Sequence, residues 1–274
     1  VSIQFTDFRK KGVRFQYPFG QVDYTNKVGT DDWDYIKNLH EDTDFSEFYN
    51  PITYLADNNV MTDDAAIIRN FNFTKDTAYH FDATKFGAWL KDNICIPRGV
   101  NVVRDSVAKI FRKTNGSDEV DFLQLKGSPM LKIEADLFID CTGFKSLLLE
   151  QEMGSEFISF NDVLLNDTAI ATRIPFLDKE KELHNTTDCH ALQYGWVWNI
   201  PLWSRIGTGY CYSSKFTTDE LAEKEFRKHL AKSDVKRAEE AEFFKIDIRH
   251  GKRKRAWVKN VVGIGLSYGF LEPL

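Results

Sequence analysis

Cysteine is scarce in this sequence of 274 residues, which has only four, at widely separated positions. No two of them form a Cys-x-x-Cys pair, which argues against a zinc site or a redox-active dithiol. Each cysteine falls in or near an apolar stretch, where a reduced, buried thiol is the usual state. Because reduced thiols are typical of the cytoplasm, we expect a cytoplasmic protein without a metal site.

Long hydrophobic runs and a dominant charge are also missing. No apolar run is long enough to span a membrane, so no membrane partner is expected. The 36 basic and 41 acidic residues are mixed along the chain and leave a formal net charge of −5. Since nucleic-acid binding requires a broad basic field, no nucleic-acid partner is expected either. The single basic cluster, Lys252–Arg255, is interpreted as solvent-exposed charge at the start of a strand. A localisation signal or a phosphate-binding role is the alternative.

Apolar and aromatic residues, by contrast, are plentiful. Apolar residues make up 42% of the chain, and 22 phenylalanines provide enough aromatic surface for a packed core and a lined ligand space. Residues 21–78 are polar and irregular, which is typical of a lid or binding loop. The sequence begins at Val1 and ends at Leu274 without a polar tail. We therefore expect a piece of a longer protein, truncated at both ends.

The hydrophobic pattern becomes periodic from residue 79. Asp82 or Thr84 is placed to cap a helix, His80 is expected to help set its start, and Pro97 with Gly99 should end it. The apolar face of this helix comprises Phe86, Trp89, Leu90 and Ile94.

Strands and a second helix follow. The turn Asn115-Gly116 indicates a hairpin. Thr217-x-x-Glu220 is typical of a capping box, and the helix that it opens has Ala222, Phe226 and Leu230 on one face. Strands are predicted at 100–111, 119–126, 131–141, 168–174, 192–200, 206–213, 243–249 and 256–266. This mixture predicts an α+β fold with much antiparallel sheet, in one domain or two tightly joined ones.

Two motifs lie on predicted strands. The run Trp196–Pro201, WVWNIP, places two indoles at i and i+2, so both face the same side and form a flat apolar wall. Alone, such a pair is more simply explained by core packing. The run from Ala135 to Gly143 is an apolar strand that ends in Asp-Cys-Thr-Gly. Turns of this kind often hold the phosphates or ribose of a nucleotide.

Two further runs contain residue types that are suited to ligand binding or catalysis. Gly263-x-Gly265 resembles a dinucleotide-binding turn, but a true fingerprint needs a following helix and a distant acid. A glycine-rich strand end that approaches a ligand closely is therefore the better interpretation. The run Phe8–Phe15 mixes aromatic residues with adjacent lysines, which alone would be ordinary surface charges.

Together, in this order, these four runs resemble the flavin-dependent tryptophan halogenases. Trp196–Pro201 fits the WxWxIP motif that separates this family from related flavin monooxygenases. Tyr79–Ala83 is similar to a helix start of the family, and Ala256–Leu274 is similar to the run before its catalytic Glu-Ser. The resemblance covers nearly the whole chain, though residues 21–78 match weakly.

The resemblance implies an α+β, flavin-monooxygenase-like FAD-binding fold with a mixed-sheet substrate region. Residues 79–150 and 243–274 would belong to the FAD-binding module, and residues 1–78 and 151–242 mainly to the substrate region. The implied reaction uses FADH2, O2 and halide to make hypohalous acid, which passes to a lysine and halogenates tryptophan or a related indole or aromatic. A separate flavin reductase and a possible homodimer are the implied partners.

The same resemblance implies the site residues. Aligning Val13-Arg14-Phe15 with the family places the catalytic lysine at Lys10, with Lys11 as the alternative. Flanking aromatic residues would partly desolvate its ammonium group. Tyr17 stands where some members have histidine, so the exact substrate stays open. The implied flavin contacts are Val103, Asp140, Thr142, Gly143, Gly263, Gly265 and Phe270. The implied substrate contacts are Tyr17, Phe19, Trp196 and Trp198.

Two elements of the family pattern do not occur between Val1 and Leu274: the GxGxxG turn for the FAD pyrophosphate, and the catalytic Glu-Ser. We therefore expect this chain alone to bind FAD weakly and to halogenate nothing. Two other classes of function stay open. One is a flavin-dependent aromatic monooxygenase of the same fold, and the other is an inactive fragment or binding scaffold.

Overall fold

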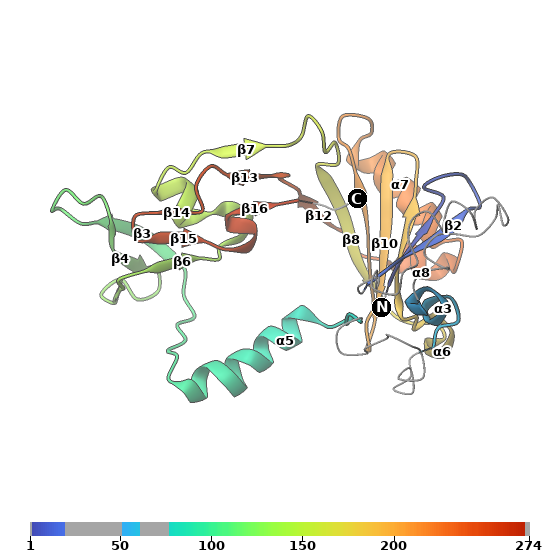
Figure 1. Cartoon of the computed structure of the whole chain (residues 1–274), viewed down its shortest axis with the longest axis horizontal. Helices are drawn as coiled ribbons and strands as arrows, with labels where there is room; N and C mark the ends of the chain where they lie inside the picture. The colour runs from blue at the N-terminus through green and yellow to red at the C-terminus, as the bar shows by residue number, and fades with distance from the viewer. Residues whose placement is uncertain (1, 20–50, 61–76, 272–274) are drawn as a thin grey trace, which may run out of the picture. The chain divides into compact units, whose positions relative to one another are not determined.

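The computed structural model describes residues 2–19, 51–60 and 77–271, so most of the predicted loop 21–78 lies outside the described residues (Figure 1). The chain divides into two compact units: residues 1–86 with 168–246, and residues 87–167 with 247–274. Helices and sheets are mixed, and the predicted α+β class is confirmed. The boundaries predicted from the sequence lie after residues 78, 150 and 242. The assignment of the two parts to FAD binding and substrate binding stays a prediction.

A seven-stranded sheet forms the first unit, in the order β12-β8-β11-β10-β9-β1-β2. From β8 through β11 and β10 to β9 the neighbouring strands are antiparallel, as are β1 and β2, whereas β1 and β9 are parallel. The strands are β1 (Ser2–Thr6), β2 (Arg14–Pro18), β8 (Thr168–Ile174), β9 (Thr186–Ala191), β10 (Gly195–Pro201), β11 (Ile206–Tyr212) and β12 (Phe244–Asp247).

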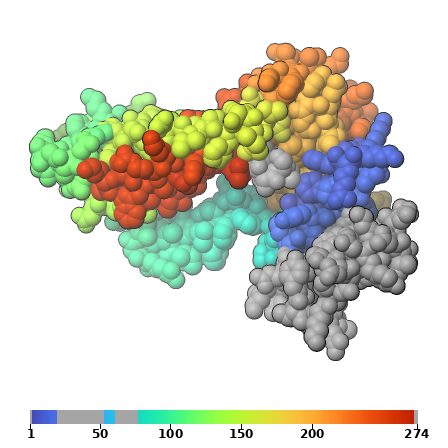
Figure 2. Space-filling view, turned by 45° about the horizontal axis from the view of Figure 1, so that its top comes forward, coloured from blue at the N-terminus to red at the C-terminus, as the bar shows by residue number. Residues whose placement is uncertain are grey.

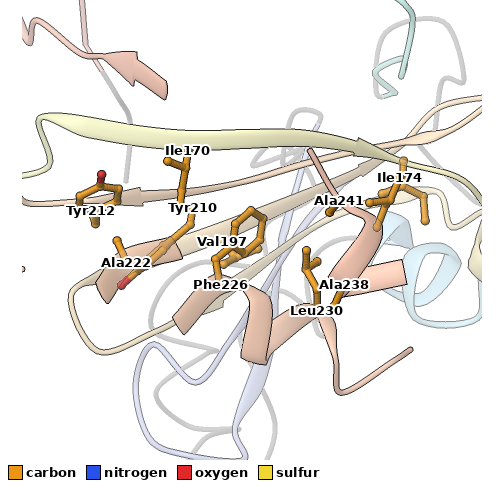
Figure 3. Packing of buried hydrophobic residues seen from close by; sticks show 11 residues of the cluster. Ile170, Ile174, Val197, Tyr210, Tyr212, Ala222, Phe226, Leu230, Ala238 and Ala241 are labelled. Carbon is orange, nitrogen blue, oxygen red and sulfur yellow. The ribbon is translucent and has the colours of Figure 1, made fainter. Parts of the chain in front are cut away.

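Residue alternation gives this sheet two chemically different faces. Trp196 and Trp198 of β10 lie on one face, which we call the tryptophan face, and Val197 lies on the opposite one, the helix face. On the helix face, Val197 and Tyr210 pack with Phe226 of helix α7 (Figure 3). All three side chains have no exposed surface. Because burial of a large apolar side chain contributes about 1.5–3 kcal/mol, this layer is the main core of the unit.

The described part of this unit also contains four helices: α3 (Pro51–Asp57), α6 (Lys179–Glu182), α7 (Asp219–Leu230) and α8 (Val235–Glu240). The apolar face predicted for α7 is confirmed, since Ala222, Phe226 and Leu230 are buried. Its predicted cap is wrong by one residue. Thr218, not Thr217, is the N-cap, and its hydroxyl accepts a hydrogen bond from the Leu221 N–H. The preceding Thr217 is buried beside the helix start instead.

Helix α5 (Ala83–Leu90) begins after Asp82, as predicted, because one Asp82 carboxylate oxygen accepts hydrogen bonds from the N–H groups of Thr84 and Lys85. A π-helical turn (Lys91–Cys95) and a 3₁₀ turn (Ile96–Arg98) continue it. Gly99, with φ of 85°, ends the run, which also confirms the predicted stop. The predicted apolar face is present but not buried by the described residues, since no residue of α5 is buried.

The second unit contains three three-stranded sheets, ordered β3-β4-β5, β14-β15-β6 and β16-β13-β7. Its core gathers Val120, Phe138, Leu149 and Val261, among others. The strands are β3 (Val107–Arg112), β4 (Val120–Leu125), β5 (Lys132–Glu134), β6 (Phe138–Asp140), β7 (Phe157–Ser159), β13 (Gly251–Arg253), β14 (Trp257–Val258), β15 (Val261–Gly263) and β16 (Gly269–Phe270). Short helical turns lie at Gly143–Lys145, Leu147–Glu152 and Gly265–Ser267, called η5, η6 and η7.

The predicted strands of this unit are only partly right. The hairpin around Asn115-Gly116 is confirmed, with β3 and β4 antiparallel and Gly116 at φ of 80°. Residues 100–106 form no strand, since none of the described strands pairs with them, and an unpaired extended segment leaves its backbone groups to solvent. The predicted strands 131–141 and 256–266 are each broken in two, by Ala135–Leu137 and by Lys259–Asn260.

The four cysteines are free thiols, as predicted. Cys189 and Cys211 are buried, whereas Cys141 is exposed, so the expectation of burial fails for this thiol. Cys141 directly follows the end of β6. Within the described ranges no helix is both long and apolar enough to cross a membrane.

Candidate functional site

Trp196 and Trp198 form an apolar wall on the tryptophan face. Their ring centroids are 6.0 Å apart, but the rings are inclined by 58°, so the wall is not flat as predicted. The wall depends on glycine at position 209, which lies directly opposite Trp198 on β11. A Cβ atom on Gly209 would lie 2.1 Å from the Trp198 ring. The indole therefore rests on the backbone of the neighbouring strand, and no larger residue fits there.

The indole N–H of Trp196 is buried and has no hydrogen-bond partner among the described residues. Trp196 itself is 9% exposed. A buried indole N–H usually finds an acceptor, so Trp196 is an exception to this rule among the described residues.

His80 contacts the sheet and not the start of α5, contrary to the prediction. Its Nε2 lies 3.0 Å from the Thr187 hydroxyl, which the ladder places on the tryptophan face beside Cys189. Burial lowers the pKa of His80, against a hydrogen bond to the Pro201 carbonyl that raises it. A neutral imidazole is thus held near the end of the WVWNIP run. Sequence reasoning missed this candidate, although the Tyr79–Ala83 motif contained the signal.

Lys10 and Lys11 lie in the turn of the β1–β2 hairpin, and both are exposed. The hairpin itself lies at the surface (blue in Figure 2). The charged group that contacts an aromatic ring in this turn belongs to another exposed residue, Arg9. The Arg9 guanidinium lies 4.4 Å from the Phe15 ring centroid. The two lysines extend beyond this aromatic cluster because they occupy the turn itself.

Tyr17 and Phe19 lie at the far end of the same hairpin from Lys10. Tyr17 is on β2, on the tryptophan face by register, and is 60% exposed, while Phe19 follows the strand and is half-buried. Three strand spacings separate β2 from β10, which amounts to roughly 14 Å. The described residues therefore place Tyr17 and the Trp pair on one face without direct contact.

Asp140 is the organising residue of the second unit. It has no exposed surface. Its carboxylate accepts hydrogen bonds from the N–H and hydroxyl of Thr142, from the N–H groups of Leu148 and Leu149, and from the Ser267 hydroxyl. Burial raises the pKa of Asp140, but these hydrogen bonds outweigh it and hold the pKa below the ordinary value. Its side chain thus fixes the surrounding loops from within.

Parallel pairing of β6 and β15 brings two glycine turns together above Asp140. Gly143 has φ of 69° and Gly265 has φ of 62°, and no atom lies within 4 Å of where either Cβ would be. The Ser267 hydroxyl also lies within hydrogen-bonding distance, 3.2 Å, of the Gly143 carbonyl, and the Ser146 hydroxyl donates to the Ser267 carbonyl at 2.8 Å. Two backbone segments are therefore open to close approach by a planar ligand, which a cofactor such as flavin requires.

The other predicted flavin contacts occupy different surroundings. Gly263 is buried, and a Cβ there would lie 2.5 Å from a Leu149 methyl carbon, so this glycine makes room for the core. The Phe270 ring stands edge-on to Phe144, with centroids 5.8 Å apart. Val103 is 51% exposed and lies in the segment that forms no strand.

The described residues place no group of three histidine, cysteine or acidic side chains where they would hold a metal ion.

Comparisons with known proteins decide the family. The sequence model described as tryptophan halogenase matches residues 1–274. The chain belongs to the tryptophan halogenase family. It is 33% identical over 293 residues to the tryptophan 7-halogenase RebH of Lentzea aerocolonigenes, with 100% of this chain and 52% of the relative covered. It is 31% identical to the tryptophan 6-halogenase ThaL of Streptomyces albogriseolus, with 95% and 47% covered.

Solved structures with the same fold are found as well. The apo structure of VirX1 is 50% identical, with a TM-score of 0.91, and the match covers 99% of this chain and 53% of that one. The tryptophan 6-halogenase SttH of Streptomyces toxytricini is 30% identical with a TM-score of 0.84, and 100% and 53% are covered. The predicted halogenase-type fold is confirmed. The chain spans about half the length of the relatives that it matches.

Proposed function

We propose that the protein containing this chain halogenates tryptophan or a related indole or aromatic compound, with reduced FAD, O2 and halide. The observation that carries the proposal is the Trp196–Trp198 wall, which occupies the WVWNIP run and rests on Gly209. Membership of the tryptophan halogenase family supports it, as do relatives named tryptophan 7-halogenase and tryptophan 6-halogenase.

The reduced cofactor, together with O2, supplies the two-electron oxidation that converts halide to hypohalous acid. We propose that Gly143 and Gly265 contact it, because the space beside both glycines is open and β6 and β15 pair directly. The exposed Thr142 precedes Gly143 and is proposed to contact the cofactor as well. Asp140 and Gly263 support the cofactor site without contacting the cofactor. The Asp140 carboxylate holds the loops through its hydrogen bonds, and Gly263 leaves room for the Leu149 side chain in the core. Phe270 is proposed to border the same site. Val103 is retained as an adenine contact on the resemblance alone.

The substrate is proposed to lie on the tryptophan face, with Tyr17 and Phe19 at one side. Trp196 and Trp198 are proposed to contact the substrate there. A separate flavin reductase supplies the reduced cofactor, a homodimer is the proposed assembly, and the cytoplasm is the proposed location.

The direct test is an assay of the longest gene product that contains this chain. Purified protein is supplied with FAD, a flavin reductase, NADH, O2, L-tryptophan and either chloride or bromide. Mass spectrometry should detect monohalogenated tryptophan with the isotope pattern of the halide supplied. Omission of halide or reductase should abolish this product. Absence of any halogenated indole with the complete mixture would contradict the proposal.

Lys10 is the proposed acceptor of hypohalous acid, on the register of Val13-Arg14-Phe15. Lys10→Ala should abolish halogenation while flavin binding and hydrogen peroxide formation persist, because only the transfer step is lost. Lys11→Ala is the matched control, since both lysines are exposed in the same turn. Loss of halogenation with Lys11→Ala alone would show that the alignment is wrong by one residue and that Lys11 is the catalytic lysine. Retention of activity by both variants would place the lysine outside this turn.

A further inference from the structure

We propose that the helix face of the seven-stranded sheet holds a second binding site, which accepts a free α-amino acid with an aliphatic side chain. The site is a cavity of about 330 Å³. Ile174, Ile206 and Leu230 provide its apolar lining, and all three are buried. A cavity of this size is within the range of small-ligand sites.

The cavity is separate from the tryptophan face. Along β9, Thr187 and Cys189 face the Trp pair, so the alternating Asp188 and His190 point to the opposite side. Asp188 and His190 both line the cavity, as do His229 and Lys232 from α7 and the turn after it. The sheet itself therefore lies between this site and the proposed halogenation site.

Asp188 provides the place for an ammonium group. Its one hydrogen bond among the described residues comes from the Thr186 hydroxyl, at 2.9 Å. No ion pair with a cation is formed there by the described residues, since Arg237 is engaged by Glu182 at 2.7 Å. Burial raises the pKa of Asp188, against weaker effects of its neighbours. A partly buried carboxylate without a cationic partner is stabilised by a ligand that brings a positive charge.

The other side of the cavity provides donors for a carboxylate. Arg237 has a side chain that is 6% exposed, and its Nε–H has no partner among the described residues. The Nδ1 atom of His229 is likewise buried without a partner. Lys232 stands exposed beside these groups and adds a positive charge. An unpaired buried donor is costly, so an anionic group in the cavity would satisfy the Arg237 Nε–H.

A zwitterion satisfies both sides at once, and the apolar lining selects an aliphatic side chain. An amine alone would leave the Arg237 Nε–H unpaired, and a carboxylic acid alone would face the Asp188 carboxylate. The chemistry of the lining thus points to one ligand class, an aliphatic α-amino acid such as leucine.

The test compares three probes on the full 274-residue chain: L-leucine, its decarboxylated amine isopentylamine, and its deaminated acid 4-methylpentanoate. Isothermal titration should show saturable binding of leucine, with both analogues at least about tenfold weaker. Leucine should also shift the NMR signals of the His190 and His229 imidazoles. Equal binding of either analogue, or leucine binding without these shifts, would overturn the proposal, as would no binding of leucine.

Two variants locate the charges. Asp188→Asn keeps the shape of the side chain and should weaken leucine binding at least about tenfold. Should this variant fail to fold, Lys232→Ala, at an exposed position, should weaken leucine binding relative to isopentylamine binding. Lys224→Ala is the matched control, since Lys224 is an exposed lysine of α7 outside the cavity. A Lys232→Ala variant with the affinity of Lys224→Ala would overturn the assignment of the carboxylate side.

Discussion

Gly209 is the residue on which the wall of the candidate site depends. Gly209→Ala should lower the free energy of unfolding by about 1–3 kcal/mol and alter the near-ultraviolet circular dichroism of tryptophan, because its Cβ would meet the Trp198 ring at 2.1 Å. Gly207→Ala is the matched control on the same face of β11, since its nearest neighbour is 3.9 Å away. Denaturant unfolding measures both. Equal destabilisation by the two variants would contradict this description of the wall.

His229 makes the stability of the first unit depend on pH. Burial lowers its pKa from 6.5 to about 4, with smaller effects of His190 and Lys232. Between these two values the unfolded chain binds more protons than the folded one, so the free energy of unfolding falls as pH decreases from 6.5 towards 4. The slope contributed by this residue approaches about 1.4 kcal/mol per pH unit.

His229→Gln removes this titration and should therefore flatten the dependence of unfolding free energy on pH between 6.5 and 4. Urea unfolding at several pH values, with wild type and variant side by side, measures the difference. Above pH 7 the two proteins should show parallel pH dependence. A variant with the wild-type slope below pH 6.5 would show that another group titrates.

Single residues were predicted from the sequence where a motif fixes their direction. The shared face of Trp196 and Trp198 follows from strand alternation, and the cap at Asp82 follows from helix-start chemistry. For Lys10 the sequence left two interpretations, a surface charge or a partly desolvated ammonium group, and the structure has it exposed in a turn where Gly12 has φ of 83°. The role of Asp140 was also hidden. Its five hydrogen bonds come partly from Ser267, which is 127 residues away in sequence.

Helix α7 carries the clearest test at the level of elements, because the sequence and the structure assign its cap to different residues. Thr218→Ala should lower the free energy of unfolding by about 1 kcal/mol, since the Leu221 N–H loses its acceptor. Thr217→Val, which keeps the shape of a buried side chain, should cost less. Thermal unfolding compares the two. A larger decrease in the free energy of unfolding for Thr217→Val would indicate that Thr217 is the N-cap, as the sequence predicts.

Elements with strong periodicity were predicted well, and short strands were not. Strand β8 has the predicted limits 168–174, and α7 has the predicted apolar face. Strands β1, β2 and β9 were not predicted, because polar residues at buried positions, such as Gln16, hide their alternation. The break at Lys259–Asn260 was missed as well. There Lys259 adopts φ of 54°, and the Asn260 side chain bonds the backbone of Val120, a contact between distant segments.

The whole molecule combines two separately packed units, each with its own core. The sequence predicted the α+β class and the family, because the WVWNIP run and the glycine-rich strand ends are local signals. It could not predict which glycines face outward. Gly143 and Gly265 are open, whereas Gly263 is closed by Leu149, and only the packing of distant segments decides between these states.

The central proposal is that the protein containing this chain adds a halogen atom, and not oxygen, to an aromatic ring. The most direct test is the complete reaction with L-tryptophan and chloride under ¹⁸O2, followed by mass spectrometry of the product. The account predicts a product that gains chlorine and contains no ¹⁸O, since the oxygen leaves as water. A tryptophan product that carries ¹⁸O and no chlorine would contradict it and would identify the protein as a monooxygenase.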